Sequence, residues 1–373
     1  MPAPRIGNSM IVLRALIALI ILGTTAYPLV LSAEARKYRI AAIIPLTGQV
    51  ASVGRYVKQG IDLALKQLPS KEREKIELIY DDDGFDPNRT ISAYRRLKSQ
   101  GGLDAVLVVG SPPANALVPI TERDKTILIA IGASDPTIAN GREYSFIHWV
   151  TPKVLGDALA QEISRRDLKK IAFIVAEVSG TIADAQGAIR ALKDLQLEDR
   201  VTIHETFLRE TTDYRSILAK VRENSADGVV AILFPGALSS FAKQFREMKI
   251  SAELIGMETF EDESEVKAAQ GALTGAWYVN AADNSELFVK LFKHQYHEHP
   301  GWGAGNAFDT INLLSSAVSK VGIENLTIRD FLRSVSNYSG ATGVYSASGN
   351  NCFTLPASVK KVTAHGFEKF NQK

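Results

Sequence analysis

The sequence predicts an α/β protein made of two doubly wound lobes, each with a parallel sheet. From Tyr38 onward, candidate strands and helices alternate, and the alternation starts again after residue 151. Unbroken apolar runs such as 105–109 are typical of strands covered by helices on both faces. The 373-residue chain also exceeds the size at which one hydrophobic core usually stops growing, about 250 to 300 residues. We therefore expect two lobes.

The first lobe begins with a strand at 38–45. An amphipathic helix follows at 53–68, with apolar residues at helical spacing along one face, and a second strand follows at 75–80. Asp86-Pro87-Asn88 opens the next helix, because Asp accepts hydrogen bonds at a helix start and Pro suits the first helical position. The remaining elements expected here are the helix 89–99, the strand 105–109, the helix 114–123 and the strand 127–131.

The second alternation follows Trp149-Val150-Thr151-Pro152. Its expected helices are 155–166, 182–195, 214–224 and 239–248, and its expected strands are 170–175, 202–207, 228–233, 253–256 and 277–280. Three later helices, 286–297, 304–321 and 328–336, have apolar faces but few strands between them. We expect the chain to return and pack these helices on the first lobe.

Residues 1–35 have the composition of an export signal. Two arginines precede the apolar run 15–23, and Ala33-Glu34-Ala35 fits the small-x-small rule for cleavage. We therefore expect an exported, periplasmic protein. Retention of the apolar stretch 15–31 as a membrane anchor is the alternative.

Charge and cysteine content narrow the possible functions. Removal of residues 1–35 leaves 41 basic and 40 acidic residues, so the net charge gives no case for nucleic-acid binding. Cys352 is the only cysteine, so no internal disulfide bond can form. Asn350-Asn351-Cys352-Phe353 carries no catalytic signature, which favours a loop or strand-start residue over a nucleophile.

Two of the expected strands end in a glycine, a hydroxyl and a proline. Gly110-Ser111-Pro112 follows the strand 105–109, and Gly132-Ala133-Ser134-Asp135-Pro136 follows the strand 127–131. Ligands of parallel sheets bind at the carboxyl ends of strands, where hydroxyls and the free N–H groups of a following helix can hold an anion. The two serines are therefore candidates for binding a small carboxylate. The alternative is that each serine only caps a helix.

Over residues 38–370 the chain resembles the periplasmic substrate-binding proteins of the branched-chain amino acid type, which serve ABC transporters. The matching pieces, in order, are 43–48 with Gly54, Tyr80-Asp81-Asp82 with Asp86-Pro87, Gly110-Ser111, 132–136, Asp213-Tyr214, Gly256-Met257-Glu258 and 305–310. The resemblance implies the type I periplasmic binding fold, in which three crossings form a hinge between two closing lobes. It places the crossings near 149–151, 279–282 and 343–348, the first lobe at 36–149 plus 281–345, and the second lobe at 150–280 plus 346–373.

The resemblance also assigns ligand contacts. The hydroxyl and amide of Ser111, backbone groups of Gly132 and Ala133, and the hydroxyl of Ser134 would hold a carboxylate, and Glu258 would pair with an ammonium group. An alternative for Glu258, which is followed by four more acidic residues before position 266, is a partner for a helix dipole.

Several positions depart from the family pattern. Aromatic residues of the relatives correspond to Val53, to Thr181 or Ile182, and a tyrosine corresponds to Phe234. The acidic residue expected just after the first crossing has no clear counterpart. We expect Val53, Thr181 and Phe234 to line the site of a small carboxylate-bearing ligand, an amino acid or a derivative of one.

Other motifs carry weaker functional signals. The resemblance places the family's disulfide at Phe85 and Gly110, so that disulfide is absent. Three further groups are best explained structurally: 301–305 as a glycine-rich turn rather than a dinucleotide loop, His294, His297 and His299 as a solvated helix end, and Asp81-Asp82-Asp83 as a polar strand end. We expect no metal, no cofactor and no catalytic residue.

The resemblance favours a monomeric receptor that captures a small solute between its lobes and delivers it to an ABC permease. A sensor or regulatory protein with the same fold, anchored through residues 15–31, is the alternative. An exported enzyme is a weaker hypothesis, because no catalytic constellation is evident.

Overall fold

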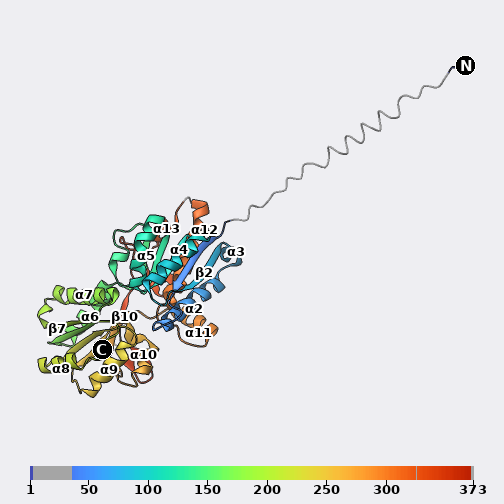
Figure 1. The fold of residues 1–373 in the computed structure, drawn as a ribbon. Coiled ribbons are helices and arrows are strands. Elements are labelled where there is room, and N and C mark those ends of the chain that lie inside the picture. The colour runs from blue at the N-terminus through green and yellow to red at the C-terminus, as the bar shows by residue number, and fades with distance from the viewer. Residues whose placement is uncertain (3–35, 325, 371–373) are drawn as a thin grey trace. The chain divides into compact units, whose positions relative to one another are not determined.

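Two separate sheets with parallel cores organise the chain, as the sequence predicts (Figure 1). The computed structural model describes residues 1–2, 36–324 and 326–370. The expected export signal at 1–35 lies almost wholly outside these residues. Residues 37–373 group into one compact unit, to which the following description applies.

The first sheet has five parallel strands in the order β2-β1-β3-β4-β5. The central strands β3 and β4 are buried along their whole length, because helices cover both faces. Right-handed crossovers put α2 on one face and α4 and α5 on the other. The strands are β1 (Tyr38–Ile44), β2 (Ile76–Asp82), β3 (Ala105–Val109), β4 (Ile127–Ile131) and β5 (Ser145–His148), and the helices are α2 (Ala51–Gln67), α3 (Ser70–Arg73), α4 (Pro87–Ser99) and α5 (Ser111–Asp124).

Three helices from late in the chain complete the first lobe, as expected. They are α11 (Glu286–Tyr296), α12 (Ala304–Glu324) and α13 (Ile328–Ser334). Figure 1 shows α12, in orange, among the blue and cyan elements of the first sheet. The long helix α12 packs against α2, and Asn306 Nδ2 donates to the backbone oxygen of His148 at the end of β5 (3.2 Å). The small hairpin of β11 (Tyr338–Gly340) and β12 (Gly343–Tyr345) follows.

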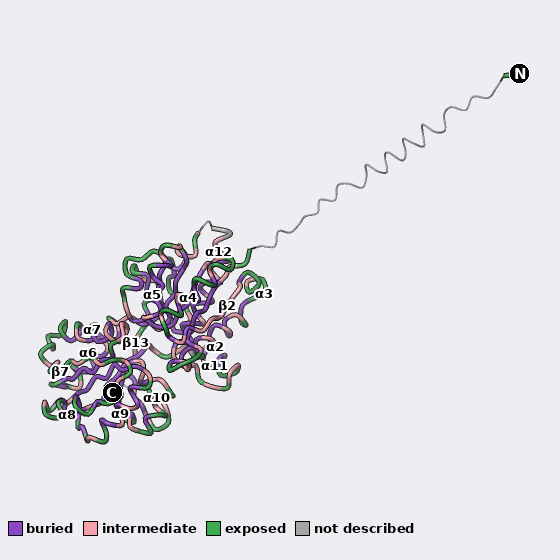
Figure 2. The backbone as a smooth tube through the Cα atoms, in the orientation of Figure 1, coloured by how far each residue is buried: buried purple, intermediate pink, exposed green. Residues whose placement is uncertain are grey.

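The second sheet has seven strands in the order β14-β13-β10-β9-β8-β6-β7. The five strands from β10 to the β7 edge are parallel, and β13 and β14 extend the sheet beyond β10 with antiparallel pairings. The strands are β6 (Ile171–Ala176), β7 (Val201–Phe207), β8 (Gly228–Ile232), β9 (Glu253–Gly256), β10 (Trp277–Ala281), β13 (Ala357–Thr363) and β14 (Gly366–Lys369), and the helices are α6 (Pro152–Arg165), α7 (Ser179–Asp194), α8 (Arg215–Asn224), α9 (Ala237–Glu247) and α10 (Glu263–Ala268). Figure 2 shows buried backbone at the centre of each lobe and exposed helix faces outside it.

Helix starts show where local chemistry sets the structure. Asp86 caps α4, since its carboxylate accepts from the backbone N–H groups of Asn88 (2.7 Å) and Arg89 (3.2 Å). Helix α5 begins at Ser111, earlier than the expected position 114. Pro112 and Pro113 fall in the first turn, where a missing N–H costs nothing and the fixed φ suits a helix, whereas Pro119 lies inside the helix.

The chain passes three times between the two sheets. The first passage follows β5 at residues 149–151, and the second follows β10. The third was expected near 343–348, but Cys352 still pairs with the edge of the first sheet through Ile147, whose N–H donates to the Asn351 oxygen (3.0 Å). This pairing moves the third passage to residues 354–356.

Cys352 itself is buried, and burial raises the pKa of its thiol to about 11. A thiol with so high a pKa is a poor nucleophile at neutral pH. Within the described part of the chain, no helix combines the length and the hydropathy needed to cross a membrane.

Candidate ligand-binding site

The carboxyl ends of both parallel sheets face one cleft, which has two connected compartments. The smaller, of about 100 Å³, is lined by 19 residues from both lobes, and we call it the inner chamber. The larger, of about 640 Å³, is called the outer cavity. Val53, Asp262 and Trp302 line both compartments. Of the eight residues assigned to the site from the sequence, all but Ala133 line the inner chamber, and Ala133 is fully buried beside it.

Ser111 and Ser134 lie together at the ends of β3 and β4. The Ser111 hydroxyl oxygen accepts hydrogen bonds from the backbone N–H groups of Ser134 and Asp135, both at 3.1 Å. Ser111 therefore stabilises the turn after β4, and does not cap its own helix as the alternative interpretation suggested. Its hydroxyl proton is left for an acceptor in the chamber.

Glu258 follows β9 and lies at the start of a short 3₁₀ turn, Glu258–Glu261. Its Oε1 accepts from Trp149 Nε1 (2.9 Å) and from the Ser134 hydroxyl (3.4 Å). Burial raises the pKa of Glu258, while these hydrogen bonds act in the opposite direction. The carboxylate thus connects the second lobe with the first passage and with the end of β4.

Asp184 is a second carboxylate in the inner chamber, and the sequence reasoning missed it. It comes from α7, has only 2% of its surface exposed, and its Oδ1 has no hydrogen-bond partner. Burial raises its pKa well above the ordinary value, and the charge of Glu258 raises it further. A sequence signal for Asp184 is its position one helical turn after Thr181, among alanines that belong to the buried side of α7. An acidic residue in such apolar surroundings is a candidate for a functional role.

The opposite wall of the chamber is apolar. The Phe85 and Phe234 rings, one from each lobe, lie 5.2 Å apart between their centroids, and Val50 and Val53 extend this wall. Phe85 also packs on Gly110, where any side chain would collide with the ring. The ring thus occupies the place that the resemblance assigned to a disulfide.

Thr181 lines the chamber, but its hydroxyl has other partners. It lies within hydrogen-bond distance of the backbone oxygens of Ala176 (2.6 Å) and Val178 (2.8 Å), and it can donate to either of them. The Thr181 hydroxyl is therefore directed to the backbone, and the side chain packs in the chamber wall with Val53 and Phe234.

Gly132 makes room for an indole ring. A Cβ atom at this position would lie 1.9 Å from the Trp302 ring, and the backbone has a φ of +62°. Trp302 also packs against Trp149, with 4.7 Å between the ring centroids. Trp302 belongs to the glycine-rich segment 301–305, which forms a turn into α12, as predicted.

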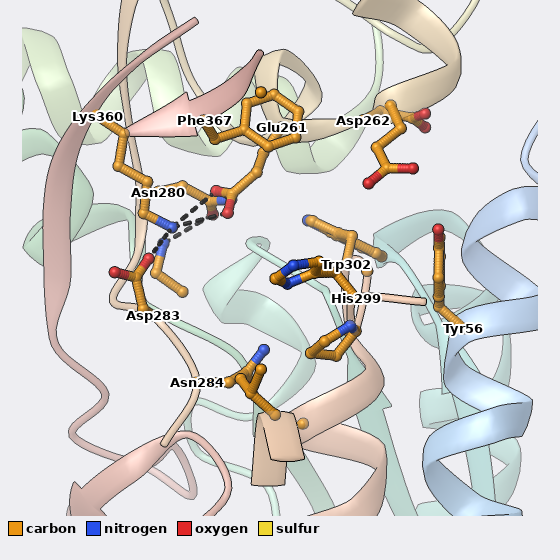
Figure 3. A pocket seen from close by; sticks show the side chains of 18 of the residues that line it. Tyr56, Glu261, Asp262, Asn280, Asp283, Asn284, His299, Trp302, Lys360 and Phe367 are labelled. Atoms are coloured by element: carbon orange, nitrogen blue, oxygen red, sulfur yellow. Dashed lines mark hydrogen bonds and ion pairs between the residues drawn. The ribbon is translucent and has the colours of Figure 1, made fainter. Parts of the chain in front are cut away.

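The wall of the outer cavity contains a cluster of paired polar side chains (Figure 3). Lys360 is 3% exposed and binds Glu261 Oε1 (2.8 Å) and Asp283 Oδ1 (2.9 Å), while Asn280 Nδ2 donates to Glu261 (2.6 Å). Figure 3 shows this cluster on one side of the cavity, with Trp302 and Tyr56 on the other. The cluster joins the end of β10 to β13 and stabilises the wall of the cleft.

The acidic and histidine clusters noted in the sequence do not form a site of their own among the described residues. Asp82 accepts from Thr47 Oγ1 (2.6 Å) and the Leu46 N–H (2.8 Å), and such hydrogen bonds lower its pKa to about 2. His297 ends α11 and His299 lines the outer cavity. Among the described residues, no three His, Cys, Asp or Glu side chains are grouped so as to hold a metal ion.

A ligand-sized cleft between two α/β lobes, lined by hydroxyls, carboxylates and aromatic rings, defines a two-lobed solute-binding protein. The chain belongs to the periplasmic binding protein family, whose sequence profile matches residues 37–359.

A Leu/Ile/Val-binding protein homolog 2 from Brucella abortus is 29% identical over 99 residues. That alignment covers 25% of this chain and 26% of the Brucella protein, so the chain matches only about a quarter of this curated relative.

Solved structures show the fold. A leucine-binding protein from Thermotoga maritima has a TM-score of 0.83 at 18% identity, over 89% of this chain and 97% of that one. A branched-chain amino acid transporter substrate-binding protein from Streptococcus pneumoniae in complex with isoleucine has a TM-score of 0.79 at 19% identity, over 89% of this chain and 98% of that one. A solute-binding protein from R. palustris in complex with benzoate also has a TM-score of 0.79, at 18% identity, over 90% of this chain and 95% of that one.

Proposed function

We propose that this protein is an extracytoplasmic receptor that binds an amino acid, or a close derivative, between its lobes and delivers it to an ABC permease. It would act as a monomer in the periplasm. With the third passage at 354–356, the closing lobes would comprise 36–149 with 281–353, and 150–280 with 357–370. Membership of the family supports the receptor role.

The observation that supports a ligand with an ammonium group is the position of the Glu258 carboxylate in a chamber without basic residues. Among the described residues that line the inner chamber there is no Lys, Arg or His. A desolvated carboxylate without a cation is costly, and a ligand ammonium would remove that cost. The Trp149 indole and the Ser134 hydroxyl orient the carboxylate for this contact.

The carboxylate of an amino acid would bind near the N-termini of α5 and α7. Helix α5 begins at Ser111 and α7 at Ser179, and a Cβ at Gly180 would lie 2.9 Å from the Ser111 oxygen, so the two helix N-termini meet. Pro112 and Pro113 leave the first turn of α5 without two of its N–H groups, so a carboxylate there would be held by the amide and hydroxyl of Ser111, by the N–H groups at the start of α7 and by the helix dipoles. The wall of Phe85 and Phe234 would then contact an apolar side chain.

A simple acid is a less suitable ligand. Structural neighbours include the benzoate complex and a fatty acid substrate-binding protein from Thermomonospora curvata. In the inner chamber of this protein, the single negative charge of such an acid would face Glu258 as a like charge. An ammonium group on the ligand reverses this repulsion.

The test is a thermal-shift and calorimetric panel of aliphatic amino acids against aliphatic and aromatic acids. Wild type should bind an amino acid, and Glu258→Gln should weaken that binding by about thirtyfold or more, because removal of one partner of a buried charge pair costs about 2 to 5 kcal/mol. Glu247→Gln, the same change at an exposed site on α9, is the control.

Two results would count against the proposal. Tight binding of a simple acid by wild type, unchanged or improved in Glu258→Gln, would show that the ligand has no ammonium group. Unfolding of Glu258→Gln by circular dichroism would assign the residue a structural role instead.

A further inference from the structure

Two buried carboxylates in the inner chamber share one hydroxyl. Ser134 Oγ donates to Glu258 Oε1 and also lies within hydrogen-bond reach of Asp184. One hydroxyl has one proton, so it cannot donate to both acids at once. This arrangement leaves Asp184 Oδ1 without a partner, although its side chain is almost fully buried.

The groups that face this pair offer no compensating charge. Trp149 and Ser134 face it from the first lobe, and Val53 of α2 and Trp302 complete that side. The third carboxylate of the chamber, Asp262, caps α10 and accepts from the Ser264 N–H (2.8 Å). A cation close to the chamber wall, Arg209, stacks over the Phe234 ring, with 5.4 Å from the guanidinium carbon to the ring centroid.

Two carboxylates that meet in a buried site do not both ionise, because each destabilises the charge of the other. The empty pair therefore holds one proton, since burial raises both pKa values and the charge of Glu258 raises the pKa of Asp184 further. A ligand ammonium supplies the positive charge that lets both acids ionise.

We propose that Asp184 is the second ligand-binding carboxylate, and that entry of a primary ammonium group between Asp184 and Glu258 releases the shared proton to solvent. The inference rests on the proposed amino-acid ligand. The balance is one proton on the pair before binding, and two carboxylates with one R–NH₃⁺ and one free proton after it. A primary ammonium group has three N–H donors, enough for both acids and one further acceptor, whereas N,N-dimethylation leaves a single donor.

Proton release makes the affinity depend on pH. Because binding expels a proton, the affinity should rise up to about tenfold per pH unit wherever the empty pair is protonated. It should become constant above that range.

The empty protein provides a test that needs no ligand. The folded pair has raised pKa values, so the folded state binds more protons than the unfolded state, and stability should fall as the pH rises above the ordinary pKa of a carboxyl group. Asp184→Asn should flatten this profile in urea titrations and make the protein more stable than wild type at the upper pH. Asp194→Asn, the same change at an exposed site on α7, should keep the wild-type profile.

Calorimetry with L-leucine, L-isoleucine and L-valine, in two buffers of different protonation enthalpy, tests the ligand-bound state. Wild type should release up to one proton per ligand, and Asp184→Asn should release none and bind about 10- to 100-fold more weakly at the upper pH. N,N-Dimethyl-leucine should bind more weakly than leucine to wild type.

The possible failures are distinguishable. If none of the amino acids binds, the proposed function fails. If they bind without proton release and Asp184→Asn matches wild type, only the role of Asp184 is overturned. An unchanged pH profile in ligand-free Asp184→Asn contradicts the shared proton directly.

Discussion

Replacement of Gly132 by alanine should destabilise the protein for two separable reasons. Its φ of +62° is left-handed, which costs a residue with a Cβ about 1 to 2 kcal/mol. The new methyl would also lie 1.9 Å from the Trp302 ring, and such overpacking typically costs about 1 to 3 kcal/mol. We therefore expect a total loss of about 2 to 5 kcal/mol in the free energy of unfolding.

Gly141→Ala isolates the first of these costs. Gly141 has a similar φ of +71°, and a Cβ there would meet nothing within 4 Å. Urea denaturation of both variants should give a loss of about 1 to 2 kcal/mol for Gly141→Ala and a larger loss for Gly132→Ala. In a Trp302→Ala background the difference should disappear, and equal losses in the original background would refute the proposed collision.

Two further changes test the site and the fold. Ser111→Ala removes the acceptor of the buried Ser134 N–H and of the half-buried Asp135 N–H, so it should lower stability by about 1 to 3 kcal/mol in urea titration. The same change at the exposed Ser92 should have little effect, and equal effects would contradict this role. Burial raises the pKa of Asp83 to about 6. Between the unfolded-state pKa and about 6, Asp83 is therefore protonated in the folded state and ionised in the unfolded state. As the pH rises through that range, the stability should fall by up to about 3 kcal/mol. Asp83→Asn should flatten this part of the pH profile of the urea midpoint, and a profile that stays unchanged would show that Asp83 ionises freely.

The fold was predictable where local signals and burial agree. Strands β3 and β4 are continuous apolar runs because both their faces are covered, and the start of α4 is encoded by Asp86 and Pro87. Strand β5 was missed because it is only four residues long and carries no periodicity. Strand β13 was missed because two lysines interrupt its apolar pattern.

Tertiary pairing explains the misses in the site and at the second sheet. Lys360 is buried in β13 only because Glu261 and Asp283, distant in the sequence, neutralise it. Asp184 resembles an ordinary helix residue until the second lobe places it beside Glu258. The strand-end residues Ser111 and Ser134 were easier to place, because parallel strands in one sheet bring their carboxyl ends to the same edge.

The interleaved order of elements constrains how the chain can fold during synthesis. One face of the first sheet is completed by α12, which ends at residue 324, and one edge of the second sheet by strands that end at residue 369. Neither lobe can therefore bury its whole core until most of the polypeptide has been made, although each has a stable-looking βαβ beginning. The early segments of each lobe therefore remain incompletely packed until the late elements have been made. Removal of the last fifteen residues should leave the second sheet with an open edge that is prone to aggregation.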